Sequence, residues 1–123
     1  MSESCIVCLE VAGEIDLPGG ILWEDAEAIA FHVPPTDATP VPCIGQCLVV
    51  TRRHVDHLAD LTDQESASVA RASRALVTVL RATGVEGVTV DAVGPGHVSA
   101  VVGGRQGHAD VITDFVNGLR AHL

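Results

Sequence analysis

One long amphipathic segment constrains the fold of this chain more than any other feature. Thr62, followed three residues later by Glu65, forms a capping box, which predicts that a helix begins there. Small and apolar residues then recur at steps of three and four, and Gly84 is a suitable stop. The stripe consists of Val69, Ala72, Ser73, Leu76, Val79 and Leu80. We therefore expect a helix with one face packed inward and its arginines near the other.

Short apolar runs on both sides of this helix predict β-strands. The runs are 21–24, 28–31, 47–51, 88–93 and 97–102. The first two form a hairpin, and the last two flank the tight connection Gly94-Pro95-Gly96. The proline-rich segment 34–45 predicts a surface loop, because each proline removes a backbone donor and fixes φ. A second helical stripe covers 110–119, so the expected class is α+β.

The distribution of charge narrows the choice of partners. A chain of 123 residues is expected to form one domain over 1–123, and its net charge is −9. All seven basic side chains are arginines, and the first is Arg52. With so few cations and aromatic rings, nucleic acid is not an expected partner. No apolar run approaches the roughly 18 residues of a membrane span, and no signal peptide is evident, so we expect a soluble, cytoplasmic protein without a membrane partner.

Two closely spaced thiols, Cys5 and Cys8, form a C-x2-C pair. In a cytoplasmic protein such a pair favours a metal over a disulfide, and a closed zinc site needs two further ligands. Candidate ligands are His32, His54, His57, His97 and His108. The alternative is free thiols with histidines that are solvated or hydrogen-bonded. Cys43 and Cys47 are interpreted as a packed thiol pair, and the neighbouring Arg52-Arg53 as a solvated pair at a strand end.

Several short motifs resemble, in order and spacing, landmarks of the histidine-triad (HIT) superfamily of nucleotide-binding and nucleotidyl-transfer proteins. They are Cys5–Ile15, Trp23–Asp25, Ala30–His32, Leu48–Val55, Leu61–Glu65 and Gly103–Gln106. The resemblance implies a HIT-like fold with a five-stranded antiparallel sheet and one long helix, to which the pattern above adds a C-terminal helix. It also implies a homodimer, through a sheet edge or the long helix.

The same resemblance implies a metal site. HIT members that bind zinc, and their uridylyltransferase relatives, draw ligands from positions that are Cys5, Cys8, His54 and His97 in this chain. We therefore expect zinc as cofactor, and the sequence leaves open whether it is structural or catalytic.

The catalytic pattern of the family is incomplete here. Its triad strand carries three alternating histidines, and this chain keeps only His97, with Ser99 at the position of the nucleophile and Val101 at the third. Gln46 replaces an upstream histidine, and Asp91 stands where the family has an asparagine. A serine without an adjacent base is a weak nucleophile, and a carboxylate repels phosphate. Nucleotidyl transfer and hydrolysis of the usual HIT kind are therefore not expected.

These replacements suggest a cleft repurposed to bind or convert a small metabolite. Asp91 is a candidate general base, with Ser99 as the second catalytic candidate, and Gln46 and Ser99 are candidates to orient a polar ligand. Arg105 is a candidate ligand-binding fork for carboxylate or phosphate, or else a solvent-exposed turn residue. The alternatives are a non-catalytic binding or structural module, and residual nucleotide binding without turnover.

Overall fold

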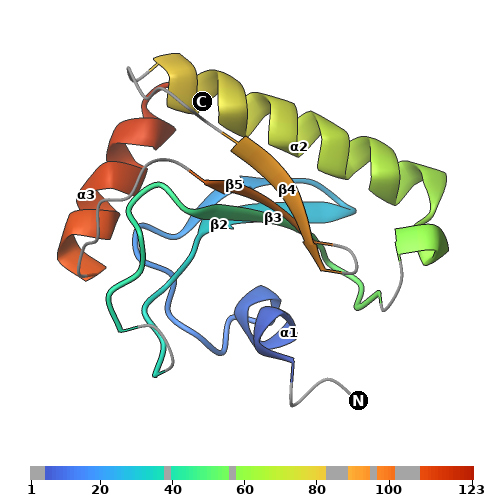
Figure 1. Ribbon diagram of the computed structural model, residues 1–123, viewed down its shortest axis with the longest axis horizontal. Coiled ribbons are helices and arrows are strands. Elements are labelled where there is room, and N and C mark those ends of the chain that lie inside the picture. Colours follow the sequence, from blue (N-terminus) through green and yellow to red (C-terminus); the bar gives the residue numbers. More distant parts are fainter. Residues whose placement is uncertain (1–4, 38–39, 56–57, 83–88, 95–96, 102–108) are drawn as a thin grey trace.

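The computed structural model describes residues 5–37, 40–55, 58–82, 89–94, 97–101 and 109–123. The elements are α1 (Ile6–Val11), β1 (Ile21–Glu24), β2 (Ala28–His32), β3 (Cys47–Thr51), the 3-10 turn η1 (Leu58–Asp60), α2 (Asp63–Ala82), β4 (Thr89–Gly94), β5 (His97–Val101) and α3 (Ala109–Arg120). The helix α2 covers one face of the sheet and α1 lies against the opposite face (Figure 1). The expected α+β class is confirmed.

A five-stranded sheet with the order β1-β2-β3-β5-β4 forms the centre of the fold. Every neighbouring pair is antiparallel. The hairpins β1–β2 and β4–β5 are local, as the sequence predicts, but β5 rather than β4 pairs with β3. The long connection through α2 thus returns to the outer position of the sheet and leaves β4 at its edge.

Residues of β2 and β3 alternate between two apolar layers, as the two-residue period of a strand requires. Ala28, Ala30, Cys47 and Val49 belong to the larger layer, which α2 and α3 complete. The other layer is smaller. It contains Ile29, Phe31 and Val50, with Val7, Val11, Leu17 and Leu48 packed against it.

The capping box that predicts the start of α2 is present. The Thr62 hydroxyl accepts a hydrogen bond from the backbone N–H of Glu65 at 3.0 Å, and the Glu65 carboxylate accepts one from the Thr62 N–H at 2.9 Å. Five of the six stripe residues are buried, and Ser73 is half-buried. Gly84, the expected stop, lies outside the described residues.

The proline-rich segment is less exposed to solvent than the predicted surface loop. It has no helix or strand in its described part, but Pro34 and Pro42 are fully buried. The cause is His32, itself fully buried, whose Nε2 accepts a hydrogen bond from the Gly45 N–H at 2.8 Å. Its Nδ1 bonds the carbonyl of Val33 at 2.8 Å. The buried ring thus draws the segment onto the sheet and is itself held as a neutral tautomer.

Among the described residues, no helix combines the length and the apolar character that crossing a membrane would require.

Candidate metal centre

The two N-terminal thiols are brought together by a short helix. Cys5 is the N-cap of α1, and its Sγ accepts from the Cys8 N–H at 3.4 Å. A residue three positions after the cap faces back toward it, so both sulfur atoms lie at the same end of the helix. Val7 and Val11 pack on the smaller apolar layer and hold α1 against the sheet. The C-x2-C pair therefore lies at a defined place beside the sheet.

His54, which follows β3, completes a group of three donors. Its Nδ1 lies 3.0 Å from the Cys8 Sγ, and the three donor atoms of Cys5, Cys8 and His54 all lie within 4.8 Å of one another. Donors around a tetrahedral zinc ion are separated by about 3.4–3.8 Å, given its bond lengths. Two thiols and one imidazole are also the soft donors that zinc favours. The donor set and its spacing fit this ion.

The thiols differ in their electrostatic surroundings. Burial raises the pKa of the Cys5 thiol, but hydrogen bonds with the backbone and side chain of Cys8 and with His54 outweigh this effect and lower the pKa overall. A lowered pKa favours the thiolate, which is the form that binds metals. Cys47 shows the contrasting case, because burial raises its pKa to about 12 and keeps it a thiol.

Arg53 fixes the segment that carries His54. Its Nη2 and Nε bond the two carboxylate oxygens of Glu65 at 2.7 and 3.1 Å, and Nη2 also donates to the carbonyl of Asp60 at 3.0 Å. The Thr51 hydroxyl donates to the Arg53 carbonyl at 2.7 Å. The Arg53 side chain and then the Thr62 N–H lower the pKa of Glu65 to about 2.

Arg52 is anchored in a similar way. It donates to the Glu24 carboxylate and to the Asp25 carbonyl, both at 2.7 Å. Both arginines are exposed to solvent, as the interpretation of a solvated pair at a strand end expects, and the structure adds their ion-pair partners. Their partners come from three distant segments, which a reading of the local sequence does not bring together.

For His97, the expected fourth ligand, the structure gives the position of the backbone in the sheet. His97 is the first residue of β5 and is the antiparallel partner of Val50. Directly opposed residues share one face of a sheet, and Val50 belongs to the layer beneath α1. Position 97 is thus on the α1 face, near the end of β3 from which the chain leads to His54.

The expected cleft residues lie toward the other end of the same strands. Ser99 is opposed to Leu48 on one side and to Asp91 on the other. Gln46 directly precedes β3, and its carbonyl accepts from the Val33 N–H at 2.8 Å. The backbone therefore brings these positions together. Arg105 lies outside the described residues, as do His57 and His108.

Glu10 is a residue of this face that sequence reasoning missed. Only 4% of it is exposed, and burial raises its pKa to about 7. It occupies the inner side of α1 together with Val7 and Val11, an arrangement that the three- and four-residue spacing would have signalled. The sequence signal for this buried residue is a carboxylate on the apolar face of a predicted helix.

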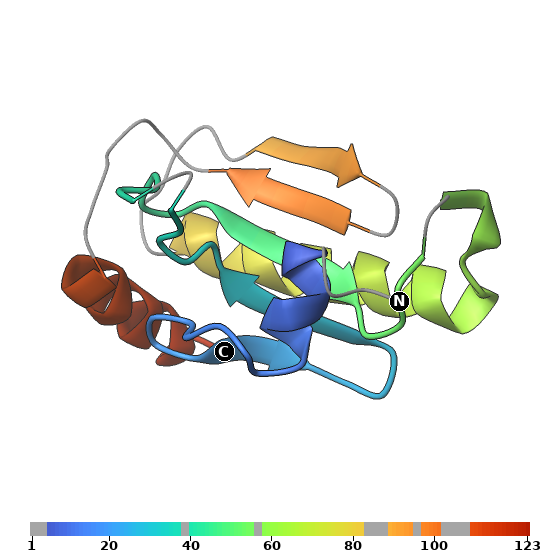
Figure 2. The ribbon, with the colours of Figure 1, turned by 90° about the horizontal axis from the view of Figure 1, so that it is seen from below.

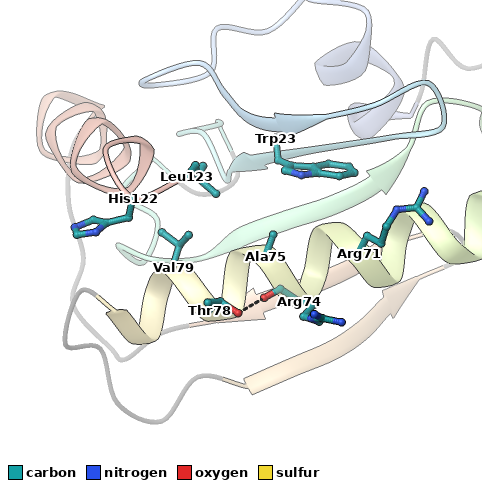
Figure 3. Close-up of a pocket in the computed structure, with 8 residues that line it drawn as sticks. All are labelled: Trp23, Arg71, Arg74, Ala75, Thr78, Val79, His122 and Leu123. Carbon is teal, nitrogen blue, oxygen red and sulfur yellow. Dashed lines mark hydrogen bonds between the residues drawn. The ribbon is translucent and has the colours of Figure 1, made fainter.

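A pocket of about 570 Å³ lies away from the candidate site residues described above (Figure 3). Trp23 of β1 faces one side of it, and Arg71 and Arg74 lie on α2 along the other. The Arg71 side chain already forms a hydrogen bond within the chain, because its Nη2 donates to the Ser68 hydroxyl at 3.0 Å. None of the residues expected to form the site lines this hollow.

Comparison with solved structures identifies the fold. No protein-family model matches the sequence, and a search of curated proteins finds no match. A zinc-bound histidine triad family protein from Mycobacterium smegmatis superimposes with a TM-score of 0.73 at 17% identity, over 99% of this chain and 96% of that chain. This chain has the histidine-triad fold.

Two further HIT structures agree. A Hit-like protein from Bartonella henselae, described as involved in cell-cycle regulation and solved with an unknown ligand, gives a TM-score of 0.74 at 18% identity over 96% of this chain and 95% of that one. A hypothetical histidine triad nucleotide-binding protein from Sulfolobus tokodaii gives 0.71 at 12% identity, over 97% and 93%. Identities this low establish the HIT fold of this chain and nothing about its chemistry.

Proposed function

We propose that this chain is a zinc-binding member of the HIT superfamily, a single soluble cytoplasmic domain over 1–123. The observation that carries the proposal is the cluster of Cys5, Cys8 and His54, whose donor atoms lie within 4.8 Å of one another. These residues come from α1 and from the segment after β3, so one ion would fasten the N-terminal helix to the sheet. The zinc-bound structure from M. smegmatis supports the choice of metal.

His97 is the proposed fourth ligand. Its support is the register, which opposes it to Val50 on the α1 face of the sheet. Two thiolates and two imidazoles would close a tetrahedral site and leave no open coordination position. The zinc is then structural, and any chemistry belongs to other residues of the chain.

The proposed role of the cleft is to bind or convert a small metabolite, without nucleotidyl transfer or hydrolysis. Ser99 and Val101 stand where the family strand has histidines, and Asp91 is opposed to Ser99. In this proposal Asp91 is the general base, Gln46 and Ser99 orient the ligand, and Arg105 contributes a further hydrogen-bonding group. A carboxylate beside a hydroxyl favours ligands less anionic than a nucleotide.

Elemental analysis of purified protein tests the metal directly. We expect about one zinc per chain, since one ligand set is present. Cys8→Ser and His54→Ala should each lose the zinc, whereas His122→Ala, which removes an exposed imidazole elsewhere, should retain it. Replacement by Co²⁺ should give the visible and thiolate charge-transfer absorption of a tetrahedral site. Wild-type protein that binds neither ion would disprove the proposal.

The loss of nucleotide chemistry is tested separately. Wild-type protein should not hydrolyse an aminoacyl-adenylate model substrate, and purine nucleotides should not shift its thermal unfolding. The triple variant with Gln46→His, Ser99→His and Val101→His restores the missing imidazoles and is the matched comparison. If the wild type already equals that variant in rate, the proposed loss of activity is wrong.

We also propose that the chain pairs into a homodimer. Support comes from the HIT fold and from the edge strand β4, which offers unpaired backbone groups. Light scattering coupled to size-exclusion chromatography should give twice the mass of one chain. A monomer at micromolar concentration would contradict the proposal.

A further inference from the structure

His54, one of the three clustered donors, lies on an exposed segment beyond the sheet. β3 ends three residues before it, at Thr51. The residue is exposed, although its Nδ1 lies 3.0 Å from the Cys8 Sγ. A metal ligand binds well only when the groups around it fix its orientation. Contacts made by the rest of this segment therefore decide how well the imidazole is held beside the thiols.

Arg53, the residue before His54, is anchored through both its backbone and its side chain. Its carbonyl accepts a hydrogen bond from the Thr51 hydroxyl at 2.7 Å. Its guanidinium donates to the two carboxylate oxygens of Glu65 at 2.7 and 3.1 Å, and to the Asp60 carbonyl at 3.0 Å. A planar guanidinium held by such a fork has a defined orientation. The direction in which the chain continues toward His54 is thereby restricted.

Glu65 is a rigid anchor for this arginine. Its side chain is 3% exposed, whereas that of Arg53 is 53% exposed. The same carboxylate accepts a hydrogen bond from the Thr62 N–H, so it is held in the first turn of α2. Figure 2 shows the beginning of α2 and the end of β3 at the same end of the molecule. The ion pair thus ties the segment of His54, whose imidazole contacts a cysteine of α1, to the helix that covers the opposite face of the sheet (Figure 1).

We propose that Arg53 is the positioning residue of the metal centre, and that its ion pair with Glu65 sets the zinc affinity by holding His54 in place. The inference rests on the proposed zinc site of Cys5, Cys8 and His54. Arg53 does not itself bind the ion and acts through the next residue of the chain. Because energetic coupling is reciprocal, zinc uptake should in turn stabilise the ion pair and the first turn of α2.

Zinc affinity, measured by competition with a chromophoric chelator, tests the proposal. Arg53→Ala should weaken zinc binding by roughly 10–100-fold, the usual effect of removing a group that orients a metal ligand. Arg52→Ala is the matched control. It removes the same charge from the neighbouring residue, whose partners are the Glu24 carboxylate and the Asp25 carbonyl, and should leave the affinity nearly unchanged.

Two further variants separate positioning from general stability. Glu65→Gln should weaken zinc binding as Arg53→Ala does, and combining the two should cost little further affinity, because both remove the same ion pair. Ser68→Ala, which removes the hydrogen bond from α2 to the Asp25 carboxylate, weakens the fold elsewhere and should keep the wild-type affinity. Co²⁺-loaded Arg53→Ala should also have altered visible and thiolate charge-transfer absorption, which a destabilised but correctly formed site would not show.

The outcomes distinguish this inference from the zinc proposal. Wild-type zinc affinity in Arg53→Ala, or in Glu65→Gln should the first variant fail to fold, would overturn the inference and leave the metal site standing. An equal loss of affinity in Ser68→Ala would overturn it as well, because affinity would then follow overall stability. Wild-type protein that takes up neither zinc nor Co²⁺ would overturn both.

Discussion

The two faces of the sheet differ in how their buried polar groups are hydrogen-bonded. On the face covered by α2 and α3, His32, Thr51, Glu65 and Ser68 are all buried, and each has hydrogen-bond partners within the chain. On the face covered by α1, Glu10 is buried, and no hydrogen bond or ion pair to its carboxylate is found in the described part of the chain. Among the described residues, the buried polar groups of the first face are thus satisfied by internal hydrogen bonds, whereas the Glu10 carboxylate of the second face is not.

The largest expected effect is on the α2 face. Leu80 is fully buried in the larger layer, and Leu80→Ala should lower the free energy of unfolding by about 2–5 kcal/mol, because it leaves a cavity. Urea denaturation with zinc held constant measures this. Val7→Ala on the α1 face, where the side chain is only half-buried, should lower it by about 1 kcal/mol. Equal losses would show that the two faces are packed alike.

Substitution of Ser68 tests whether the buried hydrogen bonds on the α2 face contribute to the stability of the fold. Its hydroxyl donates to the Asp25 carboxylate at 2.8 Å, and the residue is 1% exposed. Ser68→Ala should destabilise the fold by about 1.5–3 kcal/mol, since the bond is to a charged group. Ser66→Ala, on the exposed side of the same helix, is the control and should be near neutral. If Ser68→Ala left the free energy of unfolding unchanged, the hydrogen bonds on the α2 face would not explain the difference between the two faces.

Glu65 should make the α2 face sensitive to acid. Its pKa in the folded protein, about 2, is below the ordinary value of 4.5. The stabilisation is therefore fully present above pH 4.5 and is lost as the pH falls toward 2. Chemical denaturation across this range should show a smaller decline for Glu65→Gln than for the wild type. Parallel declines would mean that other carboxylates control acid unfolding.

His32 should give a smaller effect nearer neutrality. Burial lowers its pKa, and its hydrogen bond to the Val33 carbonyl opposes this only in part. The unfolded chain then binds a proton more readily than the folded one, so stability should decline as the pH falls below the ordinary value of 6.5. Denaturation at pH 7.5 and 5.5 measures the decline, and His122→Gln should leave it unchanged. A flat profile would show that the buried ring accepts a proton without loss.

Local signals in the sequence were sufficient for the individual elements. The capping box of Thr62 and Glu65 predicts where α2 begins, and the strand-like runs predict the hairpins β1–β2 and β4–β5. These signals depend on residues that are close in the chain. The burial of Glu10 is also foreshadowed locally, because it is a charged residue in the apolar helical stripe of Val7 and Val11.

Contacts between distant segments could not be predicted in the same way. The pairing of Arg53 with Glu65 and of Arg52 with Glu24 joins elements whose relative positions only the packed fold defines. The burial of Pro34 and Pro42 likewise depends on His32, which lies in a different element from Gly45, its hydrogen-bond donor. Solvated loops and buried loops can have the same composition.

By itself the sequence determined the α+β class, the start of the long helix and the residue types available to hold a metal, because periodicity and side-chain chemistry are local properties. The tertiary structure alone decided that Cys8 lies 3.0 Å from His54 and that β5 inserts beside β3. It also decided that Glu10 is enclosed, with no hydrogen-bond donor to its carboxylate among residues 5–37, 40–55, 58–82, 89–94, 97–101 and 109–123. Such arrangements follow from the packing of α1 and the strands together, where burial of apolar surface brings groups 46 positions apart into contact.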